Sequence, residues 1–223
     1  MRQLKNRLYT VQTLVPTGAR VADIGTDHGH LPISLIKAGI SPLVLACDIK
    51  EKPLLSAKTN IEKTGTKNIE LRLGDGLEAV LPNEVDCIVI AGMGGEVISG
   101  ILDNCPWVKN EHYTLVLQPM TAADSLRRYL CSNGFKIQLE KAVEDSGRLY
   151  TVIKAVYCGE NPPQSEVFYR IGKLNADNPC DRRYIQKQLR IASKCLNDLE
   201  NAGKDSLLYN ELCRQLKIIL GEK

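Results

Sequence analysis

The chain has no apolar run long enough to cross a bilayer, which takes about 20 consecutive apolar residues in a helix. Its first seven residues carry three basic side chains and lack the apolar core of a signal peptide. Its eight cysteines are scattered without a C-x-x-C pair, which argues against a zinc site and against a secreted disulfide framework. These absences predict a cytoplasmic protein with no membrane segment and no structural metal.

The glycine spacing of a dinucleotide-binding fingerprint is also missing. Residues 21–29 form the most informative segment: an apolar run ends in Asp23, and the turn that follows spells G-T-D-H-G instead of G-x-G-x-x-G. The carboxylates of Asp23 and Asp27 would repel a pyrophosphate. They suit a ligand that carries nucleoside and ammonium groups, and S-adenosylmethionine (SAM) is the leading candidate.

The 223 residues are enough for one sizeable core and a small appendage, and the net charge of +3 is unevenly distributed. Residues 1–20 carry four basic side chains and no acid, whereas residues 21–160 have a net charge of −4. Residues 161–223 are again positive, with 11 Lys and Arg against 8 Asp and Glu. Basic flanking segments around an acidic centre would suit a catalytic domain that binds a polyanion at its edges. Ordinary solvent-exposed surfaces explain the charges equally well.

Strand-like and helix-like segments alternate along the first two thirds of the chain. The pattern predicts strands at 20–24, 43–48, 69–73, 85–91 and 113–118 and helices at 2–15, 31–38, 51–64, 95–104 and 122–133. Such alternation indicates an α/β fold with parallel strands and helices on both faces of the sheet. Residues 135–143 and 149–157 then predict an antiparallel hairpin, which completes the seven-stranded, Rossmann-like layout of a class I SAM-dependent methyltransferase.

The segment Gly159-Glu-Asn-Pro-Pro163 indicates a domain boundary, so we expect one domain over 1–158 and a C-terminal domain over 163–223. Two stripes of apolar residues at helical spacing follow it: Ile185, Leu189, Ala192, Leu196 and Leu199, then Leu208, Leu212, Leu216 and Ile219. Residues 201–205 can turn the chain between them. The stripes therefore predict a small, coiled-coil-like helical hairpin whose apolar faces pack together.

In an open parallel sheet, ligands bind beyond the carboxyl ends of the strands. The candidate cofactor residues at these ends are Asp23, Gly25, Asp27, His28, Gly29, Asp48, Ile49, Asp75, Gly76, Ala91, Gly92 and Met93. Asp48 would accept the ribose hydroxyl protons, with a helix N-cap as its alternative role. Asp75 could accept from the adenine amino group, and the turn glycines allow the backbone to approach the ligand closely.

The fourth and fifth strand ends bear on the methyl acceptor. The fourth strand ends in small residues and Met93, without the Asn-Pro-Pro-aromatic sequence typical of amino-directed adenine methyltransferases, so attack by a ring nitrogen is favoured. The fifth ends at Gln118 and Pro119, which we expect to contact the substrate at the same rim. His28 and His30 form an H-x-H without a further ligand at metal spacing, so a metal site is not expected.

Four motifs together resemble one family closely. They are A-D-I-G-T-D-H-G-H-L-P at 22–32, I-A-G-M-G-G at 90–95, L-Q-P at 117–119 and L-R-R-Y-L at 126–130. In these motifs the chain is similar to the bacterial tRNA (adenine-22-N1)-methyltransferases, the TrmK family, from about residue 2 to residue 157. The resemblance implies a Rossmann-like catalytic domain, a coiled-coil-like C-terminal domain, SAM as cofactor and tRNA as substrate, with no protein partner evident.

The chemistry that this resemblance implies is modest, because N1 of adenine attacks the methyl group in line and no covalent enzyme intermediate is needed. Alignment of the reactants can supply several kcal/mol, up to roughly 7–11 in ideal cases. We assign Asp27 the catalytic position, where it would orient the base or the cofactor ammonium. N1 lies on the Watson–Crick edge, so the base must leave the stack. Arg2, Lys5 and Arg7, with the C-terminal hairpin, would hold the tRNA backbone, which predicts steep salt dependence.

Two alternatives remain open from the sequence. One is a class I methyltransferase that acts on another RNA position, a small molecule or a protein, and that has no need of basic flanks. The other is a non-catalytic RNA-binding protein with a vestigial cofactor pocket. An NAD-dependent oxidoreductase is disfavoured by the missing glycine spacing.

Overall fold

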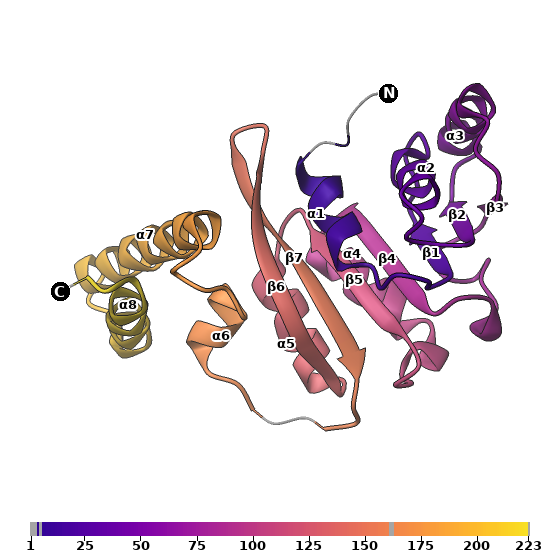
Figure 1. Cartoon of the computed structure of the whole chain (residues 1–223). Coiled ribbons are helices and arrows are strands. Elements are labelled where there is room, and N and C mark those ends of the chain that lie inside the picture. The colour runs from indigo at the N-terminus through magenta and orange to yellow at the C-terminus, as the bar shows by residue number, and fades with distance from the viewer. Residues whose placement is uncertain (1–3, 5, 161–162, 223) are drawn as a thin grey trace.

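A single mixed sheet organises the protein, whose computed structural model describes residue 4, residues 6–160 and residues 163–222. In this part of the chain, seven strands pair in the order β3-β2-β1-β4-β5-β7-β6 (Figure 1). They are β1 (Val21–Ile24), β2 (Val44–Asp48), β3 (Ile69–Leu73), β4 (Cys87–Met93), β5 (Thr114–Pro119), β6 (Phe135–Asp145) and β7 (Arg148–Tyr157). β1 to β5 are parallel, and β7 pairs antiparallel with both β5 and β6, so the predicted sheet and hairpin are confirmed.

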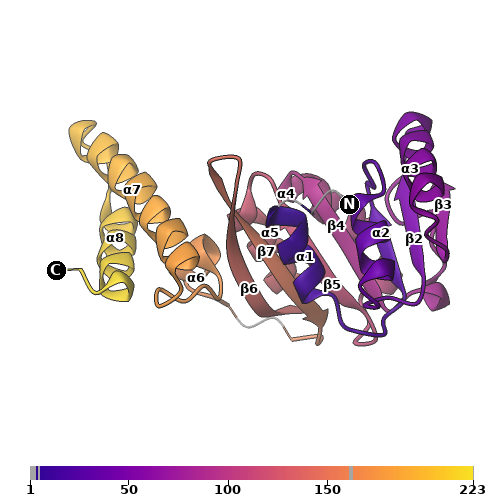
Figure 2. The ribbon, with the colours of Figure 1, turned by 45° about the horizontal axis from the view of Figure 1, so that its top comes forward.

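Helices cover both faces of the sheet, as the alternating pattern predicts (Figure 2). They are α1 (Asn6–Leu14), α2 (His30–Lys37), α3 (Glu51–Thr64), α4 (Gly95–Asp103) and α5 (Ala123–Ser132), with short 3-10 turns η1 (Pro82–Glu84) and η2 (Pro106–Val108). The helix predicted over 2–15 is observed from Asn6 to Leu14. Arg2 and Lys5, which were predicted to contact tRNA, lie outside the described residues.

The core forms because neighbouring residues of a strand point to opposite faces of the sheet. Val21, Val44 and Val89 point to the face that α1 and α2 cover. Ile24 and Ile90 belong to the opposite face, where α4 and α5 pack. Burial on both sides explains why the central strands are largely apolar, with Asp23 and Gln118 as buried exceptions, instead of alternating with exposed polar residues.

The strand order places a crevice between β1 and β4. From β1 the chain continues outward through β2 and β3 on one side and through β4 and β5 on the other. Crossovers therefore diverge at this point, which is where α/β sheets bind ligands beyond their carboxyl ends. The antiparallel β7 runs back, and the pair Leu117–Ile153 brings residues 149–151 to the same edge of the sheet as the end of β5.

Three further helices follow the hairpin: α6 (Glu166–Ile171), α7 (Pro179–Asn201) and α8 (Leu207–Leu220). α7 and α8 form the predicted helical hairpin and extend away from the sheet, whereas α6 lies against α5 (Figures 1 and 2). Their apolar cluster also includes Ala142 of β6, so the C-terminal helices share buried surface with the last strand of the sheet. The short α6 is absent from the sequence prediction.

The predicted packing stripe of α8 is wrong at two positions. Leu208 is 56% exposed and Ile219 is 38% exposed, whereas Leu212, Leu216 and Leu220 are buried. The buried residues are spaced by four, and Ile219 lies about 60° around the helix from Leu216. In the described part of the chain, no helix combines the length and the apolar character needed to cross a membrane.

Candidate functional site

The carboxyl ends of the first four strands enclose a cavity of about 170 Å³. Its walls are Ile24, Gly25, Asp48, Ile49, Gly74, Asp75, Gly76, Met93, Val97 and Ile101. The structure thus brings together six of the residues selected from the sequence: Gly25, Asp48, Ile49, Asp75, Gly76 and Met93. Ile24, Gly74, Val97 and Ile101 were missed, and the last two come from α4, whose side chains carry no local polar signal.

The backbone at Gly25 favours glycine, and the end of the Met93 side chain fills the space beside it. Its φ is +78°, and a Cβ there would lie 2.2 Å from the Cε of Met93. Met93 reaches this point because a β-bulge shifts the register of β4 between Ala91 and Met93. The turn after β1 and the end of β4 therefore meet closely at the floor of the cavity.

Asp23 lies in β1 beneath the turn and is only 5% exposed. Burial raises the pKa of its carboxyl group to about 6, and the negative charge of Asp48 adds to this, while the nearby Thr26 hydroxyl opposes it. The Thr26 Oγ1 is itself buried without a well-formed hydrogen bond in the described part of the chain. A buried acid beside an unsatisfied hydroxyl is a place that a cationic or hydrogen-bonding ligand would stabilise.

Asp48 and Asp75 approach the cavity from two different strand ends. The Oδ1 of Asp48 accepts from the Lys50 backbone N–H at 2.8 Å, which fixes the carboxylate in the turn after β2. Lys50 occupies the N-cap of α3, so Asp48 is not the cap of that helix. Asp75 is exposed in the turn after β3, where its backbone carbonyl accepts from the Glu78 N–H.

Asp27, His28 and Gly29 lie in the outer part of the same turn and not in the cavity wall. The side chain of Asp27 is 77% exposed and forms an ion pair with the His28 Nε2 at 3.3 Å. His28 adopts a φ of +60°, unusual for a residue with a side chain, so the turn is held in a constrained conformation. Among the described residues, no group of three or more His, Cys, Asp or Glu side chains is arranged to hold a metal ion.

Gln118 is fully buried at the end of β5 and organises the rim through its amide. Its Oε1 accepts from the backbone N–H of Gly92 at 3.1 Å and from the Arg7 guanidinium, and its Nε2 donates to the carbonyl of Pro119. The bulge in β4 removes Gly92 from the sheet ladder, so Gln118 provides the acceptor that the ladder does not. Arg7, 18% exposed, also pairs with Asp145 at 3.7 Å.

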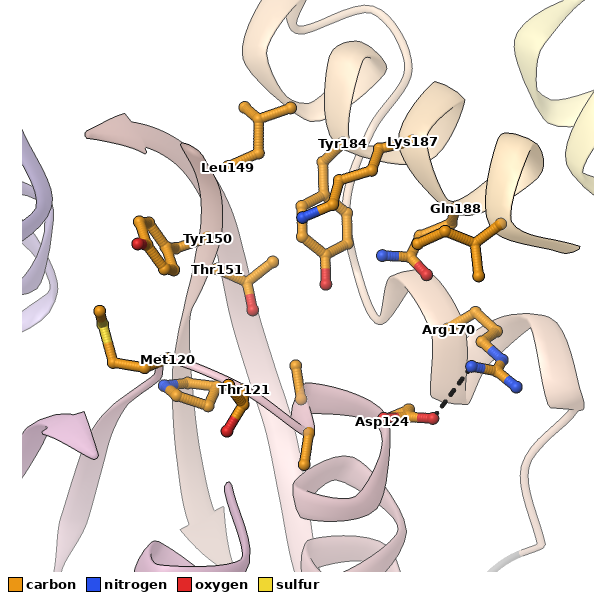
Figure 3. Close-up of a pocket in the computed structure, with 14 residues that line it drawn as sticks. Met120, Thr121, Asp124, Leu149, Tyr150, Thr151, Arg170, Tyr184, Lys187 and Gln188 are labelled. Carbon is orange, nitrogen blue, oxygen red and sulfur yellow. Dashed lines mark hydrogen bonds and ion pairs between the residues drawn. The ribbon is translucent and has the colours of Figure 1, made fainter. Parts of the chain in front are cut away.

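A second cavity, of about 230 Å³, lies where the loop after β5 faces the start of β7 and helices α6 and α7 (Figure 3). It is lined by residues 119–124, by Leu149, Tyr150 and Thr151, and by Arg170, Tyr184, Lys187, Gln188 and Ile191. The Arg170 Nη1 donates to the Asp124 carboxylate at 3.1 Å, and its Nε is buried without a partner among the described residues. Apart from Pro119, none of these residues was predicted from the sequence, because the cavity is formed by contacts between distant segments.

The two cavities lie on either side of the ends of β4 and β5. Met93 lines the first cavity, and its backbone carbonyl accepts from the Met120 N–H, at 2.7 Å, on the wall of the second. One sheet edge therefore presents an acidic, glycine-rich cavity next to a cavity with Arg170 and Lys187 in its wall. The arrangement is suited to two different ligands that meet at this point.

Comparison with known proteins agrees with this geometry. Residues 4–153 match the model of a methyltransferase domain family. The chain is 38% identical to the tRNA (adenine(22)-N(1))-methyltransferase of Bacillus subtilis (strain 168) over 154 residues, which cover 69% of this chain and 65% of that enzyme.

Solved structures extend the similarity over the whole chain. The B. subtilis M1A22 tRNA methyltransferase TrmK superposes with a TM-score of 0.79 at 29% identity, covering 99% of this chain and 97% of that one. A candidate tRNA (m1A22) methyltransferase of Streptococcus pneumoniae, in complex with S-adenosyl-L-methionine, gives 0.80 at 31% identity, covering 96% and 98%. The chain therefore belongs to the methyltransferase domain family and, within it, to the TrmK family of tRNA (adenine(22)-N(1))-methyltransferases.

Proposed function

We propose that the protein transfers a methyl group from SAM to N1 of an adenine, at position 22, in tRNA. One observation carries the proposal: in a chain of the TrmK family, an acidic, glycine-rich cavity and a cavity with basic residues adjoin at the ends of β4 and β5. The first suits a cationic nucleoside and the second a polyanionic substrate. We also expect the protein in the cytoplasm, where tRNA is found.

The residues of the first cavity fit SAM in three respects. Gly25 has no side chain and only the flexible end of Met93 covers its backbone, so a ligand that displaces this methyl group can approach the turn closely. Next to the wall residues Ile24 and Gly25 in the chain, the buried Asp23 carboxylate and the Thr26 hydroxyl offer polar groups that a cationic ligand would complement. Asp48 and Asp75 provide acceptors for hydroxyl and amino groups. We propose that these residues, with Ile49 and Gly76, hold the cofactor.

The bound cofactor would supply a methyl group on a positively charged sulfur, and the protein has to align an acceptor with it. Alignment is the larger contribution, because the N1 lone pair of adenine is already nucleophilic and needs no strong base. Asp27 is exposed in the turn next to the cavity, so its carboxylate can face a bound base or the cofactor ammonium. We propose that it stabilises the positive charge that develops on the adenine.

We propose that the second cavity, with Pro119 at its edge, receives the tRNA. The Lys187 ammonium and the Arg170 guanidinium are suited to phosphate groups, and Tyr150 faces the cavity near Met120, where its ring could stack on a base (Figure 3). Gln118 acts indirectly by holding the bulge of β4. The predicted contacts of Arg2, Lys5 and Arg7 remain part of the proposal, with Arg7 acting through the rim network that it shares with Gln118.

The test is methyl transfer from labelled SAM to unmodified tRNA transcripts, followed by mapping of the methylated nucleotide by primer extension. We expect a stop at adenine 22 and no product when that base is guanine. Labelling of another position, or of a metabolite pool and not tRNA, would favour the other methyltransferase function. Binding of tRNA without any transfer would favour a non-catalytic RNA-binding protein.

Asp27→Ala tests the catalytic position. We expect a fall in kcat on the order of 10²-fold with SAM affinity retained. Asp103→Ala removes an exposed acid at the end of α4 that lines neither cavity, so it serves as the matched control and should keep normal turnover. Normal turnover of Asp27→Ala on tRNA would refute the role.

A further inference from the structure

The L-R-R-Y-L motif of α5 contains the most completely buried ion pair in the described part of the chain. The side chains of Arg127 and of Glu140 in β6 are both 0% exposed, with Nη2 and Oε1 3.0 Å apart. Arginine in a helix is normally a surface residue, and a buried charge is costly unless it is paired and hydrogen-bonded. The pair must therefore be satisfied by structure around it.

The partners that satisfy Arg127 come from the C-terminal segment. Its Nη1 donates to the backbone carbonyls of Tyr169 at 2.8 Å and Arg170 at 3.0 Å, which lie at the end of α6. Burial alone would lower the pKa of Arg127, but Glu140 and Tyr184 of α7 raise it above its usual value. One guanidinium thus contacts the sheet, α6 and α7 together.

Glu140 holds the link between α6 and α7 in the same way. Its Oε2 accepts from the backbone N–H of Lys173 at 2.9 Å. Gly172, with a φ of +60°, presses against the pair so closely that a Cβ would lie 1.3 Å from the Glu140 Oε2. Farther along, buried Asp181 accepts from the backbone N–H of Ala142 of β6 at 2.8 Å. The link is therefore fixed on the sheet by its backbone at Lys173, and the start of α7 is fixed there by the Asp181 side chain.

The position of this link decides where the wall of the second cavity stands. Arg170 precedes the link, and Tyr184 and Lys187 follow it on α7, and all three line the cavity. Figure 3 shows the Tyr184 and Thr151 hydroxyls pointing toward the same space, with Lys187 beside them. A shift of the link would move these groups as one unit, while the cofactor cavity at β1 to β4 would be unaffected.

We propose that Arg127 and Glu140 are positioning residues that set the α7 wall of the tRNA cavity and thereby control capture of tRNA but not of the cofactor. The inference rests on the proposed function. Its physical basis is preorganisation: a wall held in the bound position spends no binding energy on ordering when the substrate arrives. A purely structural role would instead change stability and leave the affinity for tRNA in the folded protein unaltered.

The test is the double variant Arg127→Met with Glu140→Leu. Replacing both partners of a buried ion pair by apolar residues of similar volume is often neutral for stability, so this variant can fold while losing the bonds to α6 and Lys173. We expect KM for tRNA to rise about tenfold or more, with kcat within about twofold of wild type and SAM affinity unchanged. Hydrogen exchange in residues 164–188 should also become faster.

Arg20→Met is the matched control, since it removes the Arg20–Asp86 pair (2.7 Å) at the far end of β1 and should lower stability without changing KM for tRNA. Glu140→Gln, which keeps the shape of the side chain, replaces the double variant if that protein is not recovered folded, and should raise KM for tRNA as well. Wild-type KM in a folded variant, or a parallel loss of SAM and tRNA binding, would overturn the inference. Absence of tRNA methylation by the wild-type protein would instead refute the proposed function. Hydrogen exchange in residues 164–188 would still show whether Arg127 and Glu140 hold α6 and the start of α7 in place.

Discussion

Asp23→Asn should make the unliganded protein more stable and weaken its binding of SAM. The carboxyl group has a pKa of about 6 in the folded protein against a usual 3.8, chiefly because it is buried. That difference corresponds to about 3 kcal/mol by which the ionised group favours the unfolded state at neutral pH. Asparagine has the same shape without the charge, so we expect a gain of roughly 2–3 kcal/mol at pH 7.5. For a chain of this length, the gain would raise Tm by roughly 5–10 °C.

The raised pKa of Asp23 also makes the stability of the folded protein depend on pH in a definite direction. A carboxyl group with a raised folded pKa holds a proton in the folded state between about pH 4 and pH 6, where the unfolded chain has released it. Wild-type stability attributable to Asp23 therefore falls as pH rises through this window and is constant above it. The advantage of Asp23→Asn should be about half as large at pH 5 as at pH 7.5. Urea unfolding at both pH values measures it, with SAM affinity followed by titration calorimetry.

SAM carries ammonium and sulfonium charges, so the loss of a buried carboxylate should reduce its affinity by on the order of tenfold to hundredfold. Asp86→Asn is the control, because the hydrogen bond from Arg20 lowers the pKa of that carboxyl group to about 2. This second variant should be destabilised at pH 7.5 and should bind SAM normally. Lower stability of Asp23→Asn at pH 7.5, or an equal gain at both pH values, would refute the reasoning.

Three other variants test the turn after β1, the hydrogen bonds of Gln118 and the stability of the fold at acidic pH. Gly25→Ala should reduce SAM affinity more than about tenfold by calorimetry, because its Cβ would collide with Met93, and unchanged affinity would contradict the role of the turn. Gln118→Leu leaves a buried N–H and a guanidinium without their acceptor, so urea unfolding should give a loss of about 2–3 kcal/mol, and a neutral result would argue against the network. The hydrogen bond from Arg72 lowers the pKa of Glu84 from its usual 4.5 to about 2. Ionised Glu84 therefore stabilises the fold at pH values above 4.5, and this contribution is lost as the pH falls through 2. Glu84→Gln should therefore be less stable than wild type at pH 6 and nearly equal to it near pH 2, and a constant difference would contradict the assignment.

The sheet was predictable because its signal is local. The strands are short, largely apolar runs; β1, β3 and β4 are each followed by a glycine, and β2 ends in an aspartate. The structure places their ends within a few residues of the predicted positions, as for β2 at Asp48. Parallel strands bring their carboxyl ends to one edge, so six cofactor candidates gather in one cavity without any knowledge of tertiary contacts. The α6 helix was not predictable, since its six residues are too few to display a helical period.

The second cavity and the Arg127–Glu140 pair behind it could not be predicted from the sequence, because the residues that form them are far apart in the chain. Arg127 bonds to carbonyls about forty residues away, and Gln118 accepts from Arg7, 111 residues earlier. The sequence predicted Arg7 as a tRNA contact and assigned no role to Arg127. In the structure Arg127 is fully buried and Arg7 is bound in the rim network, so the basic side chains in the wall of the proposed tRNA cavity are Arg170 and Lys187.

The placement of opposite charges along one sheet edge connects the uneven charge of the chain with the proposed chemistry. In-line transfer needs the acceptor on the side of the methyl group opposite the sulfur, so donor and acceptor must approach from two directions. Here the ends of β4 and β5, joined by the bond from the Met120 N–H to the Met93 carbonyl, separate an acidic cavity from one with basic groups. The carboxylates of the first cavity disfavour phosphate. In the second cavity Asp124 offsets the charge of Arg170, so Lys187 supplies the net positive charge that disfavours a sulfonium. We therefore infer that the charge pattern sorts the two ligands to opposite sides of the point at which they react.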